Sequence, residues 1–206
     1  RGHSVVTGAA ALPAAEGTVT LAISDGPLVF DFLGLVRSLG ARSFRVLMLS
    51  RLGAHPDARA TTLRRLWRLE EHVRAGNAPT LTLRFAPLVG PATPFWKQLR
   101  SRPALPNGGR KLVNPVAERD AVETLAAALD GRALWRGWYE VAGPDTVTLT
   151  ELCDLAAHTP GETAGRAWEP ALDEIAEHRL AESEPWASDF GITPTPLAAW
   201  AGVGAT

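Results

Sequence analysis

The stretch Phe44-Arg45-Val46-Leu47-Met48-Leu49-Ser50 decides the fold class. It is an almost unbroken run of strand-forming apolar residues, and turn-forming residues bound it on both sides. Three further runs have the same character: Thr18 to Ser24, Thr80 to Ala86 and Trp138 to Ala142. Strands that lack a polar alternation are typical of a sheet that is covered on both faces.

Helical periodicity fills the intervals between these runs. Apolar residues recur at spacings of three and four in Leu28 to Leu39, Thr61 to Ala75 and Glu118 to Leu129. Strands that alternate with helices predict βαβ units and parallel strand pairing. We therefore expect an α/β fold with a doubly wound, mostly parallel sheet.

The pattern changes between Gly90 and Lys111, where prolines and glycines surround one short helical stretch at Phe95 to Arg100. Later in the chain we expect a helix capped by Thr150 and a second helical stretch from Ala171 to Ala181. These segments predict a small α-rich lobe that lies over the sheet. The expected division is a core of residues 1–90 with 112–145, and a substrate or lid lobe of residues 91–111 with 146–206.

Composition excludes several classes of function. The chain has 206 residues, of which 46% are hydrophobic and 21% charged, and its formal net charge is −1. This balance gives no field that attracts nucleic acid or an anionic membrane, so neither is an expected partner. The single cysteine, Cys153, rules out an internal disulfide framework and suits the cytoplasm. A first residue of Arg1 rather than methionine indicates a processed or incomplete chain.

Parallel sheets of this kind bind small molecules beyond the carboxyl ends of their strands. Three loops meet that criterion: Ser24-Asp25-Gly26, Ser50-Arg51-Leu52-Gly53 and Ala86-Pro87-Leu88-Val89. We refer to this edge of the sheet as the rim. A small molecule or nucleotide at the rim is the expected ligand.

Several blocks of sequence follow one another in a set order: Ser43 to Ala54, Leu81 to Pro91, Asn114 to Val116 with Asp120 to Val122, Trp138 to Pro144 with Thr148 to Leu152, and Asp189 to Leu197. Together these blocks resemble the atypical short-chain dehydrogenase/reductases. The resemblance spans roughly residues 18 to 200. It is to the group that includes nucleotide-sugar epimerases, nitrogen-repression regulators and an accessory subunit of complex I, and it implies a Rossmann-type sheet that binds NAD or NADP.

The glycine-rich turn that holds the dinucleotide in this family is not intact here. In one alignment, Arg1 to Val6 matches the second strand of the family, so that the first strand and its turn are absent. In the other alignment, Gly8, Ala11 and Ala14 occupy the three glycine positions of the turn, so that the middle glycine is replaced by alanine. Both alignments predict a sheet that is abridged at the N-terminus, and cofactor binding is therefore in doubt.

The catalytic tyrosine and lysine of the family, four residues apart on one helix face, are also missing. The matching positions are Thr62 and Leu66, and a register shifted by one gives Leu63 and Trp67. The only tyrosine, Tyr139, is followed four residues later by glycine. We therefore expect no tyrosine/lysine proton relay.

Ser50 matches the serine with which the family polarises a carbonyl group, although a hydroxyl that caps a strand end has the same sequence signature. It is the one vestigial catalytic residue that the resemblance implies. The expected cofactor-binding positions are Ile23, Ser24, Leu49, Ser50, Pro87 and Val89.

Other clusters indicate structure rather than chemistry. The arginines of Arg59 to Arg74 are interrupted by acidic residues, which is typical of a solvated helix face. Asp173, Glu174, Glu177 and His178 share a helix face, but with a single histidine they indicate a charge cluster, so no metal is expected. Among seven tryptophans, Trp186 and Trp200 are the strongest candidates for an interface or pocket wall.

Two hypotheses of function follow. In the first, the chain keeps the scaffold without the redox chemistry and acts as a binding, sensing or accessory subunit. In the second, a nucleotide-binding N-terminal segment lies outside this sequence, and the protein is an NAD(P)-dependent oxidoreductase or epimerase that works without the tyrosine/lysine pair. A protein partner or homo-oligomer that pairs through an open strand edge is a third possibility.

Overall fold

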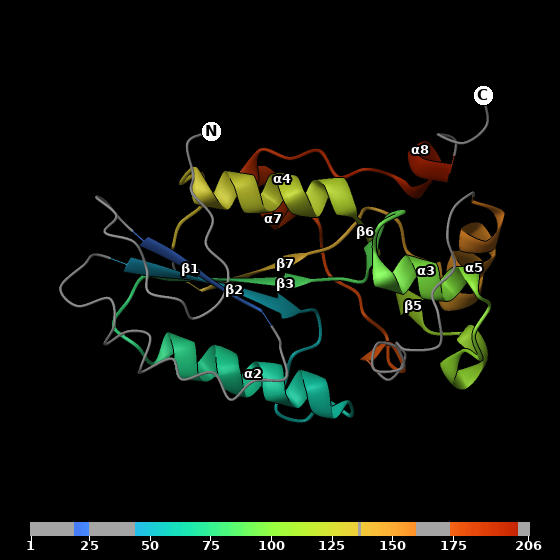
Figure 1. Ribbon diagram of the computed structural model, residues 1–206, viewed down its shortest axis with the longest axis horizontal. Helices are drawn as coiled ribbons and strands as arrows, with labels where there is room; N and C mark the ends of the chain where they lie inside the picture. The colour runs from blue at the N-terminus through green and yellow to red at the C-terminus, as the bar shows by residue number, and fades with distance from the viewer. Residues whose placement is uncertain (1–18, 25–43, 136, 160–173, 202–206) are drawn as a thin grey trace.

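The computed structural model describes residues 19–24, 44–135, 137–159 and 174–201 (Figure 1). Its central sheet has the strand order β1-β2-β3-β7, and every neighbouring pair is parallel. The strands are β1 (Val19–Ser24), β2 (Phe44–Arg51), β3 (Thr80–Phe85) and β7 (Trp138–Val141). All four begin and end within about one residue of the predicted runs, so the sequence expectation is confirmed.

Helices cover both faces of this sheet, as the doubly wound prediction requires. Helix α2 (Thr61–Arg74) lies on one face, while α4 (Glu118–Leu129) and α7 (Glu184–Phe190) lie on the other (Figure 1). Because successive side chains of a strand point to opposite faces, Val46 and Met48 pack under α2, whereas Leu47 joins the cluster on the α4 and α7 side. The predicted helix at Leu28 to Leu39 lies outside the described residues.

A second group of elements surrounds its own apolar cluster beside the sheet. Helix α3 (Pro94–Arg100) packs on α5 (Leu149–His158), and the antiparallel pair β5 (Leu112–Val113) with β8 (Val147–Thr148) lies next to them. Trp96, Leu99 and Leu149 are fully buried there. The remaining short elements are β4 (Leu88–Val89), β6 (Val116–Ala117), the 3-10 turn η1 (Pro106–Gly109) and α8 (Leu197–Ala201). The boundaries predicted for the core and the lobe stay a prediction.

Two local expectations in this second group are wrong. The cap of α5 is Thr148 rather than Thr150, because Thr148 and Glu151 form a reciprocal capping box at the required spacing of three residues. The stretch expected to be helical up to Ala181 is not helical over residues 175–181. Instead Arg179 forms a β-bridge beside Val113, with its amide donating to the Leu112 carbonyl over 2.9 Å.

Candidate functional site

The strands β1, β2 and β3 end together at the rim, which is the site that the fold predicts. Parallel pairing sets Ser24 beside Leu49 and sets Arg51 beside Phe85. The rim therefore carries the backbone of five of the six predicted cofactor positions. The sixth, Val89, is fully buried in the cluster around α3 and α5.

Ser50 and its neighbours point to different environments. Leu49 is half-buried and packs against the cluster under α4 and α7. Ser50 points to the opposite face, where it is 3% exposed. Pro87 is half-buried, and its carbonyl accepts a hydrogen bond of 3.1 Å from the amide of Val116. Ser50 is the one predicted catalytic residue at the rim. The contacts of its hydroxyl therefore show whether that group is free to act on a substrate.

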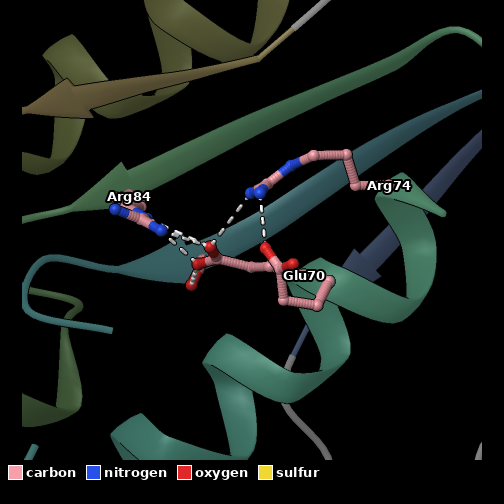
Figure 2. A network of polar contacts seen from close by, with 5 residues as sticks. Glu70, Arg74 and Arg84 are labelled. Atoms are coloured by element: carbon pink, nitrogen blue, oxygen red, sulfur yellow. Dashed lines mark hydrogen bonds and ion pairs between the residues drawn. The ribbon is translucent and has the colours of Figure 1, made fainter. Parts of the chain in front are cut away.

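That hydroxyl donates a short hydrogen bond to Glu70, a carboxylate on α2 with no exposed surface. Arg84 lies opposite Ser50 in the register of β2 and β3. Its Nε and Nη2 atoms donate hydrogen bonds to the same carboxylate, and the bond from Nη2 is 2.6 Å long. Arg74 lies 3.8 Å away on the next turn of the helix, and Figure 2 shows Glu70 between the two arginines. We refer to these four residues as the Glu70 network.

The Glu70 network ends at an aromatic side chain on the edge of the sheet. The guanidinium groups of Arg74 and Arg84 lie 5.1 and 5.0 Å from the ring centre of Trp138, within the range of cation–π attraction. The side chain of Trp138 is half exposed, whereas that of Arg84 is only 13% exposed. The network runs from the buried Ser50 and Glu70 to the partly exposed Arg74 and Trp138, and it ties α2, β2, β3 and β7 together.

The two positions that match the catalytic pair of the family lie on α2. Leu66, at the lysine position, is 1% exposed and packs with Val46 and Met48 against the sheet. Thr62, at the tyrosine position, is half-buried, and its hydroxyl has no hydrogen-bond partner among the described residues. Leu66 is therefore an apolar core residue, and its match to the lysine position stays a prediction.

The Glu70 network was not predicted, although the sequence carries a signal for it. Glu70 falls in the apolar stripe of α2, four residues after Leu66 and three before Val73. A carboxylate in such a stripe is buried, and a buried carboxylate needs a paired cation. Only the fold could show that the cation comes from β3.

Other candidate groups have structural partners. Glu174 pairs with Arg51, and the Nδ1 atom of His178 accepts a hydrogen bond from the amide of Leu112, while Asp173 of the same cluster lies outside the described residues. In the described part of the chain no three metal-ligating side chains come together. Burial raises the pKa of the Cys153 thiol, which is the opposite of the shift that activates a nucleophile.

One of the two tryptophans considered as interface or pocket candidates is a core residue. Trp186 is fully buried, and its indole N–H donates to the carbonyl of Ala142 over 3.1 Å. It therefore has the core-packing role that is the commoner use of tryptophan. The side chain of Trp200 lies outside the described set.

The parallel sheet with helices on both faces defines a class of fold, the Rossmann-type α/β fold. Solved structures bear out this fold. UDP-glucuronic acid 4-epimerase from Bacillus cereus, in complex with UDP-glucuronic acid and NAD, is 13% identical with a TM-score of 0.55, and the match covers 79% of this chain and 60% of the epimerase. The chain therefore spans less than two thirds of that enzyme.

Two further structures agree. ADP-L-glycero-D-manno-heptose-6-epimerase from Helicobacter pylori is 15% identical with a TM-score of 0.56, and the match covers 91% of this chain and 70% of the epimerase. MoeE5, in complex with UDP-glucose and NAD, is 20% identical with a TM-score of 0.56, covering 82% and 67%. No protein-family model and no curated protein sequence matches the chain. The predicted resemblance is thus confirmed at the level of the fold.

The described residues fit only part of what an NAD-dependent reaction needs. The rim offers the loop ends against which such a fold places a dinucleotide, while the region of the glycine-rich turn lies outside the described residues. Leu66 and the fully engaged Ser50 do not fit the proton transfer that accompanies hydride transfer in the family. Among the described helices, none has the length and apolar character that crossing a membrane demands.

Proposed function

We propose that this chain is a nucleotide-binding module of the epimerase and reductase fold that acts as a binding, sensing or accessory subunit, without tyrosine/lysine redox chemistry. The observation that carries the proposal is the burial of Leu66 at 1% exposure against Val46 and Met48. A lysine there would place an ammonium group inside an apolar cluster, where burial of an unpaired charge is prohibitive. Leu66 therefore serves as a packing residue of the core.

Ser50 supports the same conclusion from the side of the sheet. Its hydroxyl proton is directed to Glu70, and two arginines hold that carboxylate. A serine that polarises a substrate carbonyl must donate to the substrate instead. With 3% exposure, Ser50 also offers almost no surface to a ligand.

The ligand that we propose is a nucleotide such as NAD or NADP at the rim, bound near Ile23, Ser24, Leu49 and Pro87. Ser50 and Val89, at 3% and 0% exposure, are too deeply buried to contact it. The support is the parallel sheet itself, since ligands of doubly wound sheets bind at the carboxyl ends of the strands. In the proposed binding or sensing role, the protein would recognise the bound nucleotide without reacting with it. In an active relative, the nucleotide would supply hydride. No step of such a reaction is assigned to residues of this chain.

Calorimetric titration of the purified protein with NADH and NADPH tests the proposal. We expect binding without consumption of the reduced nucleotide when nucleotide sugars are added. Pro87→Glu, which adds a negative charge at the rim, should weaken binding. Leu134→Glu, at an exposed site before β7 and therefore at the opposite end of the sheet, is the matched control and should leave binding unchanged.

Either of two results would refute the proposal. Absence of binding of both nucleotides would remove the binding function, and turnover would remove the non-catalytic one. Turnover would favour the second candidate, an NAD(P)-dependent oxidoreductase or epimerase that works without the tyrosine/lysine pair. The observation in favour of that candidate is the likeness to NAD-dependent enzymes of which this chain spans only about two thirds.

A further inference from the structure

The segment Glu174–Arg179, here called the strap, joins the lobe to the loop that follows β2 at the rim. Hydrogen bonds and one apolar anchor attach the strap to the group of elements around α3, α5 and β5. The Arg179 amide donates to Leu112, and the Arg179 carbonyl accepts a hydrogen bond of 3.1 Å from the Asn114 amide. Ile175 is 4% exposed in the apolar cluster around α3 and α5.

The attachment of the strap to the core is of a different kind, because it is made by charged side chains. Glu174 pairs with Arg51, the last residue of β2. Glu177 lies 3.5 Å from Arg59 and 3.2 Å from Arg179, so that one carboxylate joins the strap to the loop before α2.

A glycine lets the strap approach the rim closely. Gly53 has a φ of +90°, and a Cβ atom built there would lie 2.7 Å from the Nε atom of Arg179. The guanidinium of Arg179 therefore lies directly against the loop after β2, and Arg179 is only 7% exposed. Its Nε group has no hydrogen-bond partner among the described residues.

We propose that the strap is a charge-held clasp that closes the rim: its backbone stays with the lobe, and its ion pairs to Arg51 and Arg59 hold it on the core. The Arg59–Glu177 pair, in which Arg59 is 82% exposed, weakens as salt is added, whereas the apolar anchor at Ile175 does not. The Arg51–Glu174 pair, whose carboxylate side chain is 9% exposed, is screened less. The clasp therefore opens between strap and core while the lobe remains intact. This inference rests on the proposed function, because it concerns access to the same rim.

The purpose of such a clasp is control of ligand entry. Arg51 and Gly53 belong to the rim loop on which the fold would place a ligand. The carboxylates of Glu174 and Glu177 occupy the arginines of that loop, and an anionic ligand must compete with them. Opening the clasp is expected to raise the affinity of the rim for such a ligand.

Paired spin labels measure the clasp directly. The substitutions His55→Cys, in the loop after β2, and Leu180→Cys, beside the strap, place one label on the core and one next to the strap. Both positions are exposed. The background is Cys153→Ala, so that only the introduced thiols react. We expect one narrow distance distribution at low salt, and a longer and broader one at high salt or after Arg51→Gln with Arg59→Gln.

Three controls separate the clasp from general damage. Arg68→Gln removes an exposed arginine of α2 and should leave the distribution narrow. Arg59→Gln alone alters a side chain that is 82% exposed, so it tests the clasp without risk to folding. The exchange Arg51→Glu with Glu174→Arg restores the pair with reversed charges and should restore the short distance.

A distribution that stays narrow at high salt and in both arginine variants would overturn the proposal. Glu174→Gln with Glu177→Gln opens the clasp but keeps both arginines. This variant should bind NADH more tightly than the wild type, by roughly tenfold if about 1.4 kcal/mol of clasp energy is released. Failure of NADH to bind to any form would refute the proposed function, while the label distances would still decide whether the clasp exists.

Discussion

Replacement of Glu70 by glutamine tests whether the Glu70 network holds the core together. The carboxylate has no exposed surface, and Arg84, its main partner, has a side chain only 13% exposed. Glutamine keeps the shape but removes the negative charge, so the guanidinium of Arg84 stays buried without a counter-charge. Breaking a buried ion pair by removal of one partner costs about 3–5 kcal/mol.

In a chain of 206 residues, each kcal/mol lowers the melting temperature by about 2–4 °C. Glu70→Gln should therefore lower it by roughly 6–20 °C. The assay is thermal and urea unfolding followed by circular dichroism, with the free energy of unfolding taken from the urea curve. Tryptophan emission should report the same transition, because both arginines of the network lie over Trp138.

The neighbouring residue supplies a matched control. Glu71 pairs with Arg74 on the surface, and the two side chains are 45% and 36% exposed. Exposed pairs of this kind contribute about 0–1 kcal/mol, so Glu71→Gln should change stability little. Equal losses for the two variants, or a loss below about 1 kcal/mol for Glu70→Gln, would refute the reasoning.

Three further predictions use other features. Gly53→Ala should cost more free energy of unfolding than Gly108→Ala, since both have positive φ but only the first new Cβ meets Arg179; equal costs in urea unfolding would contradict this. Hydrogen bonds from Thr148 lower the pKa of Glu151, so Glu151→Gln should destabilise the protein at neutral pH. Because the folded pKa is lowered, this difference should disappear on acidification through that pKa; a pH-independent difference would count against it. Cys153 should react more slowly with iodoacetamide in the folded than in the urea-unfolded protein, because burial raises the pKa of its thiol, and equal rates would argue against that burial.

The sheet could be predicted because its strands are almost purely apolar. A run such as Val46 to Leu49 has no polar face, and this is a property of strands covered by helices on both sides. The periodicity of α2 and α4 likewise gave their bounds to within about a residue. These signals are local, so they can be read without knowledge of tertiary contacts.

The remaining features depend on contacts between distant parts of the chain. Trp186 follows a proline and lies near the C-terminus, which suggested an exposed ring, but α7 packs it under β7. The helical pattern before Ala181 gave way to a β-bridge because Leu112 and Asn114 satisfy both backbone groups of Arg179. Tertiary hydrogen bonds overrode local propensity in that segment.

The candidate site was predictable in outline. The absence of a tyrosine/lysine pair follows from the sequence, and so does the place of the rim. The burial of Leu66 and the use of the Ser50 hydroxyl by Glu70 required the packing of α2 on β2 and β3. Those two facts give a physical reason for the proposed absence of tyrosine/lysine redox chemistry.

The most direct test is an assay of NADH and NADPH consumption with a panel of nucleotide sugars, run on the wild type and on Ser50→Ala. The account predicts no consumption above the rate in buffer for either protein. Nucleotide oxidation by the wild type that disappears in Ser50→Ala would show that this hydroxyl serves a substrate rather than Glu70, and it would contradict the central claim.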